Sequence, residues 1–182
     1  MDIRTTDPNF LYYQRTDGAQ GGTHQVVDTD QAQTIRGKLV PINPSASGLT
    51  LTAAQSGTVC LFDNAAGVTY TLPTASAGLT FTFWVTTLQT SSANVVYTGS
   101  AAIFALGAIQ MFSGVDITPS STLGPFNFAG NGTTHLRTTT NGTTTGGAVG
   151  SWQTWVALSA TQWYVTGVLL SPSGSLATPF SV

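Results

Sequence analysis

Hydrophobic and polar residues alternate along much of the chain beyond residue 46. Over residues 79–86, apolar side chains occupy every second position from Leu79 through Phe81 and Phe83 to Val85, and the positions between them hold threonine or Trp84. Alternation with a period of two is typical of a half-buried β-strand. Residues 68–72 alternate in the same way, and Pro73 ends that pattern.

Further segments have the composition of strands, and turn-forming residues separate them. These segments are residues 58–62, 94–98, 102–106, 110–112, 152–158 and 162–170. Short stretches with glycine between them, such as Ala77-Gly78 and Thr98-Gly99-Ser100, indicate turns. Strands at a spacing of about 8–12 residues indicate a sandwich or a barrel. We therefore expect an all-β chain with a single β-sandwich, preferably of the jelly-roll type.

Residues 124–150 depart from this pattern. They are rich in threonine and contain Asn131-Gly132 and Asn141-Gly142, which are strong signals for type I′ turns. Residues 133–145 are expected to form a hairpin that projects from the domain. An open, uncharged hairpin of β-branched residues would aggregate, and a symmetry mate that covered it would prevent this.

Residues 1–45 have no strong periodicity and are expected to form an extended N-terminal arm. Two clusters in it combine aromatic or aliphatic residues with cations, which are the types that anchor protein interfaces. The predicted contact residues of these clusters are Phe10, Leu11, Tyr12, Tyr13 and Arg15, followed by Ile35, Arg36, Lys38 and Leu39. The aromatic residues Phe10, Tyr12 and Tyr13 would bind a partner or pack on the arm's own domain.

The distribution of charged residues divides the chain at the end of this arm. Asp, Glu, Lys and Arg make up only 7% of the residues, and nine of these twelve lie within residues 1–38, whereas about 25% is usual for a soluble protein. Two prolines in Pro41-Ile42-Asn43-Pro44 favour an extended link. The predicted division is an arm, residues 1–45, and a sandwich domain, residues 46–182.

The scarcity of charge also limits the partners. A soluble monomer normally uses interspersed charges to resist association, so a domain with only Asp63, Asp116 and Arg137 is expected to cover its surface with copies of itself or with a partner. The net charge of −2 argues against nucleic acid, because phosphate binding needs many Lys and Arg residues. No apolar run has the length of a membrane-spanning helix, and the first residues do not resemble a secretory leader. We expect synthesis in a cytoplasm, without a cleaved leader.

Candidate catalytic groups are few. A Ser–His–Asp arrangement could use His135, Asp116 and one of many serines, but no nucleophile-elbow motif is present. His24 and His135 lie in different contexts and form no metal motif, and no phosphate-binding glycine motif occurs. Cys60 lies in an apolar run and is expected to be a buried hydrophobic residue. We expect no enzymatic activity, no cofactor and no metal.

Carbohydrate binding is the alternative from the residues themselves. Trp84, Trp152, Trp155, Trp163 and Tyr164 are able to stack on a sugar ring. They lie within strand patterns, however, so placement in the core is the favoured interpretation.

Three short motifs follow one another along the chain. They are Leu49-Thr50-Leu51-Thr52-Ala53-Ala54-Gln55-Ser56-Gly57, then Ala65-Ala66-Gly67 through Leu72-Pro73 to Gly78-Leu79-Thr80-Phe81-Thr82-Phe83, and near the end Trp163-Tyr164-Val165 with Thr178-Pro179-Phe180. In their order and spacing they resemble tailed-phage virion proteins, in particular head decoration (capsid cement) and head-fibre proteins. The resemblance covers most of residues 49–180 except 115–150.

The resemblance implies a homotrimer on the outer surface of a capsid, with the N-terminal segment bound across the major capsid protein. The expected function is therefore that of a virion structural protein that decorates and stabilises a phage capsid. The longer, more charged arm departs from a minimal cement domain. The functional alternative is a tail-fibre or receptor-binding β-module that recognises glycans on the host surface.

Overall fold

A computed structural model describes residues 3–7, 10–13, 24–25, 41–43, 48–90, 93–113, 125–172 and 175–182. The chain divides into two compact units, Met1–Leu39 and Val40–Val182. The first unit contains a three-stranded antiparallel sheet in the order β1 (Ile3–Asp7), β2 (Phe10–Tyr13) and β3 (His24–Gln25).

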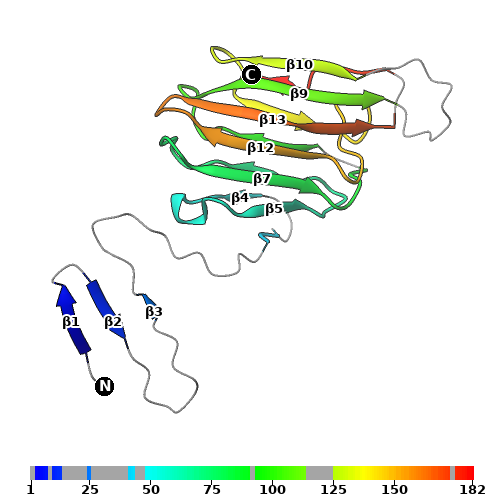
Figure 1. The fold of residues 1–182 in the computed structure, drawn as a ribbon. Helices are drawn as coiled ribbons and strands as arrows, with labels where there is room; N and C mark the ends of the chain where they lie inside the picture. Colours follow the sequence, from blue (N-terminus) through cyan, green and yellow to red (C-terminus); the bar gives the residue numbers. More distant parts are fainter. Residues whose placement is uncertain are drawn as a thin grey trace. The chain divides into compact units, whose positions relative to one another are not determined.

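The second unit is a β-sandwich of two sheets, which confirms the all-β prediction (Figure 1). The larger sheet has six strands in the order β10-β9-β13-β12-β7-β5. These strands are β5 (Val59–Phe62), β7 (Thr80–Val85), β9 (Phe104–Ser113), β10 (Phe126–Asn131), β12 (Trp152–Ala157) and β13 (Gln162–Ser171). Figure 1 views the sandwich onto this sheet.

The smaller sheet has five short strands in the order β14-β11-β8-β6-β4. They are β4 (Leu49–Thr50), β6 (Thr69–Thr71), β8 (Asn94–Tyr97), β11 (Arg137–Thr140) and β14 (Phe180–Ser181). A single turn of 3-10 helix, η1 (Ala53–Gln55), follows β4 and has Thr52 as its N-cap residue.

The chain winds back and forth between the two sheets from β4 to β9. Successive strands in one sheet are therefore parallel: β4 pairs with β6 and β6 with β8 in the smaller sheet, and β5 pairs with β7 in the larger. The sequence carries a trace of this winding, because Thr50-Leu51 precedes Gly57 just as Thr71-Leu72 precedes Gly78. The sandwich thus contains parallel as well as antiparallel pairs, unlike the antiparallel jelly roll that the sequence favoured.

One long strand replaces two predicted ones. Residues 102–106 and 110–112 were predicted as separate strands, but β9 runs without a break from Phe104 to Ser113 in parallel with β13. Gly107 lies in the middle with φ +127°, where a Cβ atom would lie 2.1 Å from the backbone oxygen of Val165. The glycine therefore allows close approach of two strands and does not end one.

The projecting hairpin predicted over residues 133–145 is wrong. β11 lies inside the smaller sheet, paired with β8 on one side and β14 on the other. Its inward side chains, Thr138 and Thr140, are fully buried. Threonine carries a methyl group as well as a hydroxyl, and the hydroxyls of both residues take part in buried hydrogen bonds with glutamine side chains.

The predicted type I′ turns at Asn131-Gly132 and Asn141-Gly142 are also wrong. Such a turn needs positive φ at both residues, and within the described segments only glycines have positive φ. Each asparagine instead accepts hydrogen bonds from following backbone N–H groups through Oδ1, from Thr133 and Thr134 in one loop and from Thr143 and Thr145 in the other. The two N-G-T-T sequences thus fold into the same side-chain-closed loop.

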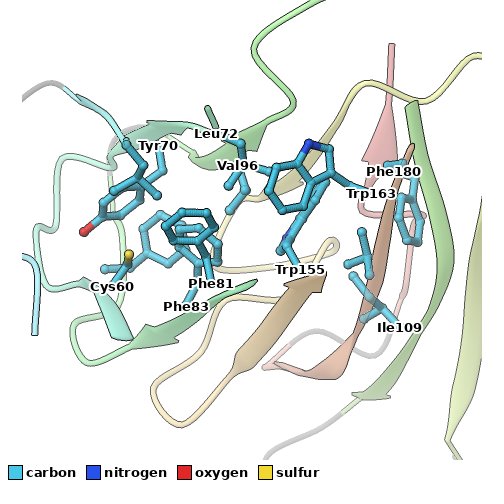
Figure 2. Close-up of a cluster of buried hydrophobic side chains, with 14 of the residues drawn as sticks. Cys60, Tyr70, Leu72, Phe81, Phe83, Val96, Ile109, Trp155, Trp163 and Phe180 are labelled. Atoms are coloured by element: carbon cyan, nitrogen blue, oxygen red, sulfur yellow. The ribbon is translucent and has the colours of Figure 1, made fainter. Parts of the chain in front are cut away.

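A single apolar core fills the space between the sheets. Phe62, Tyr70 and Phe83 form an aromatic cluster with ring centroids 5.2–5.9 Å apart, and Phe81 packs against Trp163. Figure 2 shows how side chains of this core converge from both sheets, among them Tyr70, Phe81, Phe83, Trp155, Trp163, Ile109 and Phe180.

The start of the second unit is fastened to the edge of the larger sheet. Ile42 N–H donates to the Val59 carbonyl, and Leu61 N–H donates to the Ile42 carbonyl, so this residue extends the sheet beside β5. The Tyr70 hydroxyl lies 3.1 Å from the same Ile42 oxygen and 2.8 Å from that of Leu61. Residues 41–43, which the sequence assigned to the link, therefore pack on the sandwich.

Candidate interaction surface

The outer face of the six-stranded sheet is the candidate functional surface. Its outward side chains alternate with the buried residues of each strand. They are Val59, Leu61, Thr80, Thr82, Trp84, Phe104, Leu106, Ala108, Gln110, Phe112, Asn127, Ala129, Asn131, Trp152, Thr154, Val156, Gln162, Tyr164, Thr166, Val168 and Leu170. Thirteen of these 21 side chains are apolar or aromatic, and the others are Thr, Gln or Asn. This outer set of side chains carries no charge.

Strand pairing arranges these residues in rows across the sheet. One row runs from Leu61 through Trp84 and Trp152 to Val168. A second row, four residues further along the strands, includes Val156, Tyr164 and Leu106. Directly opposite side chains in a sheet have Cβ atoms about 5 Å apart, so each row is a continuous apolar strip.

A row of small polar residues separates the two apolar strips. It contains Thr82, Thr154 and Thr166 on the three inner strands β7, β12 and β13. The hydroxyl oxygens of Thr82 and Thr154 lie 3.0 Å apart and form a hydrogen bond with each other. Part of the polar content of this face is therefore satisfied within the sheet itself.

Three aromatic residues on this face are well exposed in a single copy. Trp84 is 45% exposed, Tyr164 40% and Phe112 37%. Scattered exposed apolar residues are normal on proteins, whereas a contiguous apolar patch marks an interaction site. Trp84 and Tyr164 belong to the two apolar rows and Phe112 lies opposite Leu170, so each exposed ring has apolar neighbours on the face and the second description applies here.

The outer face of the five-stranded sheet is different in kind. Four of its eight outward residues are threonines, Thr50, Thr69, Thr71 and Thr139, and Ser181 lies at its edge. It also carries Arg137, whose guanidinium lies 5.7 Å from the centre of the Tyr97 ring, within the range of a cation–π contact. The sandwich therefore has one polar outer face and one apolar outer face.

The binding residues predicted in the arm are not tested by the fold. Phe10, Leu11, Tyr12 and Tyr13 form β2. Arg15, Ile35, Arg36, Lys38 and Leu39 lie outside the described residues.

The histidine considered as a catalytic residue makes structural contacts. His135 stacks on Phe180 with ring centroids 5.7 Å apart, and its Nδ1 accepts a hydrogen bond from the Asn131 N–H. Asp116 lies outside the described residues. In the described part of the chain, no group of three or more His, Cys, Asp or Glu side chains is placed to hold a metal ion.

Cys60 is buried as predicted, beside the Tyr70 ring system of the core. Burial raises the pKa of its thiol to about 12. A thiol with such a pKa stays protonated near neutral pH and is a poor nucleophile. Separately, no helix among the described residues is long and apolar enough to cross a membrane.

The core interpretation of the aromatic residues is right for two of the five. Trp155 and Trp163 are completely buried, whereas Trp84, Trp152 and Tyr164 lie on the outer face. The signal that could have revealed this face is the presence of apolar residues at both odd and even positions of residues 152–158 and 162–170. Strands that are apolar on both faces are typically covered on both sides.

Comparisons with known proteins find no relative of this chain. No protein-family model, no curated protein and no solved structure matches the chain.

Proposed function

We propose that this chain is a structural protein of a tailed-phage particle that decorates the outer surface of the capsid and stabilises it. The sandwich associates as a homotrimer, and the N-terminal residues 1–45 bind the major capsid protein. The protein is made in the host cytoplasm and acts without catalysis. The capsid as the partner rests on the sequence resemblance over residues 49–180.

The observation that carries the proposal is the charge-free, aromatic outer face of the six-stranded sheet. Such a face suits a protein that works by covering other protein surfaces, since tryptophan and tyrosine are enriched among the few residues that carry most of the binding energy at protein interfaces. The opposite outer face, with its threonines and Arg137, suits contact with water. A decoration protein needs both kinds of surface.

The fastening of Ile42 supports a mechanical role for the N-terminal segment. Its backbone pairs with β5, and the Tyr70 hydroxyl, which belongs to the aromatic core cluster, also reaches it. A pulling force on the residues before Ile42 would therefore be transmitted to the sheet and its core. A segment that binds assembled subunits but not free ones stabilises the shell by mass action.

Particle binding by full-length and shortened chains tests the proposal. A chain that begins at Val40 retains Ile42 and the whole described core of the sandwich, so it should fold. We expect the full chain to cosediment with undecorated capsids and to raise their resistance to heat, and the shortened chain to do neither. Equal binding by the shortened chain would refute a role for residues 1–39.

Point variants in the full chain separate binding from folding. Replacing Arg36 and Lys38 by serine should weaken capsid binding, because cations at such contacts interact with the partner's carboxylates and amides. The control is Arg137→Ser in the sandwich, which removes one positive charge from the polar outer face and should leave capsid binding unchanged. Each single variant, Arg36→Ser and Lys38→Ser, should weaken it.

Glycan recognition is the second candidate, and the exposed aromatic face favours it. Trp84, Trp152 and Tyr164 present ring systems on one sheet face, and aromatic rings stack on sugars. Binding of the full chain to host cells or to their surface polysaccharide, with loss in Trp84→Ser, would select this function. A decoration protein should show no such binding.

A further inference from the structure

The apolar outer face of the six-stranded sheet requires an occupant. In one copy, Trp84, Phe112 and Tyr164 lie more than a third exposed on it, and the two apolar strips run on either side of the threonine row. Water against this many apolar side chains is unfavourable by about 25 cal/mol for each Å². A partner that removed the face from water would gain that free energy.

The lack of charge on the face restricts what that partner is. A strongly charged surface would lose its hydration against these residues without finding an opposite charge, which is costly. The face itself meets the requirement, since its 21 outward side chains are all uncharged. Two or more copies can therefore bring their faces together without repulsion between like charges.

The size of the face fits an interface between copies. Six strands spaced about 4.8 Å apart span about 24 Å. Five of these strands have six to ten residues, which at a rise of about 3.4 Å per residue gives a length of about 20–34 Å, and the edge strand β5 has four. The resulting area of roughly 500–800 Å² approaches the roughly 800 Å² that each partner contributes to a stable interface.

We propose that this face is covered by the same face of further copies of the chain, with the row Leu61, Trp84, Trp152 and Val168 and the threonine row beside it at the centre of the contact. The inference names the surface that holds together the homotrimer of the proposed function, and it rests on that function only for the number of copies. A symmetric contact of this kind places Thr166, on the central strand β13, inside the interface.

Features of the face favour a second copy over a polysaccharide. Sugar sites place carboxylates or free amides beside an aromatic ring to bind the hydroxyl groups. Here the residues next to the Trp84–Trp152 pair are Thr82 and Thr154, and their hydroxyls bond to each other. The described face has no carboxylate. Its amide side chains, on β9, β10 and β13, lie outside that pair.

The test introduces one positive charge into the face of the full chain. Thr166→Lys is suitable because Thr166 is exposed in a single copy, so that the lysine is tolerated by the fold. Trp84→Lys is the second variant. The matched control is Thr71→Lys, which puts the same residue on an inner strand of the polar outer face. Circular dichroism and thermal unfolding establish that each variant folds, and sedimentation equilibrium over micromolar concentrations gives the molar mass.

We expect the wild type and Thr71→Lys to sediment at three times the 18.8 kDa of the chain. Thr166→Lys and Trp84→Lys should sediment as folded monomers, with association weakened at least about a hundredfold because a buried, unpaired charge is strongly unfavourable. The inference fails if both folded variants associate like the wild type, or if the wild type is monomeric. A monomeric wild type that binds polysaccharide through Trp84 would also overturn it, in favour of the glycan site.

The inference and the proposed function fail in different ways. If the folded charge variants remain trimeric and still coat capsids, the face assignment alone is wrong. If they become monomers but no form of the protein coats capsids, the face assignment stands and the capsid function is wrong. A wild type that is a dimer, sensitive to Thr166→Lys, supports the face and contradicts the trimer.

Discussion

The side chain of Gln153 forms a hydrogen bond that joins the two sheets inside the core. It lies on β12 and is 3% exposed, and its Oε1 accepts hydrogen bonds from Thr138 Oγ1 on β11 at 2.8 Å and from Trp155 Nε1 at 3.2 Å. Gln153→Leu would leave both donors buried without a partner, and each such loss costs about 1–3 kcal/mol. We therefore expect the free energy of unfolding in urea to fall by about 2–6 kcal/mol.

Thr138, whose hydroxyl donates to Gln153, provides the control. In Thr138→Val/Gln153→Leu, one unpaired donor is gone, so the double variant should recover about 1 kcal/mol relative to Gln153→Leu alone. A Gln153→Leu chain as stable as the wild type would contradict the assigned hydrogen bonds.

Cys60 makes stability depend on pH in the alkaline range. Burial raises the pKa of its thiol from 9.0 to about 12. Below pH 9 the thiol is protonated in the folded and the unfolded chain, so its contribution is constant. Between pH 9 and about 12 only the unfolded chain loses the proton, and stability falls as pH rises. We expect a lower urea midpoint at pH 10.5 than at pH 8, and a smaller decrease in Cys60→Ala, which cannot ionise there.

At the level of the strands, the close approach of β9 and β13 depends on Gly107. A Cβ atom at this position would lie 2.1 Å from the Val165 oxygen, and the φ of +127° is strained for other residues. Gly107→Ala should therefore lower the free energy of unfolding by about 3 kcal/mol or more. Gly78→Ala is the matched control, because φ is positive at Gly78 as well, at +91°, but no atom lies within 4 Å of the new Cβ. The free energy of unfolding should therefore fall by only about 1 kcal/mol in this variant. Equal losses, measured by thermal unfolding, would contradict the steric explanation.

The strands that the sequence predicted best are those with one apolar and one polar face. The expected strand at 79–86 is β7, Thr80–Val85, and the alternation correctly placed Phe81 and Phe83 on one face and Thr80, Thr82 and Trp84 on the other. β11 was missed because its inward residues, Thr138 and Thr140, look polar in the sequence. Their burial depends on Gln153 and Gln89, which lie 15 and 51 residues away.

The candidate surface was missed because its outward residues look like core residues in the sequence. In β12 and β13 both sets of alternating residues are largely apolar, so the period of two does not tell the inner face from the outer one. Only the neighbouring strands decide which set is covered, because the smaller sheet lies against one face alone. The sequence thus predicted the sandwich from local patterns, whereas the apolar outer face is a property of how distant strands pair.

At the scale of the whole molecule, the separation of charge between the two units predicts two kinds of binding. Nine of the twelve charged residues lie within residues 1–38, whereas the outer face of the larger sheet has none among its 21 side chains. Salt screens interactions between exposed charges, since the Debye length falls from about 10 Å at 0.1 M to about 3 Å at 1 M. Binding of the N-terminal residues to a capsid should therefore weaken with added NaCl.

Association between sandwiches should respond differently, because burial of apolar area is not screened by salt and sulfate strengthens it. We expect the full-length trimer to persist from low to high NaCl. The shortened chain that begins at Val40 should also remain a trimer at every NaCl concentration. Its melting temperature should rise by about 2–4 °C for each tenfold increase in protein concentration, since association stabilises the folded form. Thr166→Lys should melt at a temperature independent of concentration. A wild-type mass that falls with NaCl would mean that charged residues hold the copies together, and the binding surface would then have to be sought among residues 1–38.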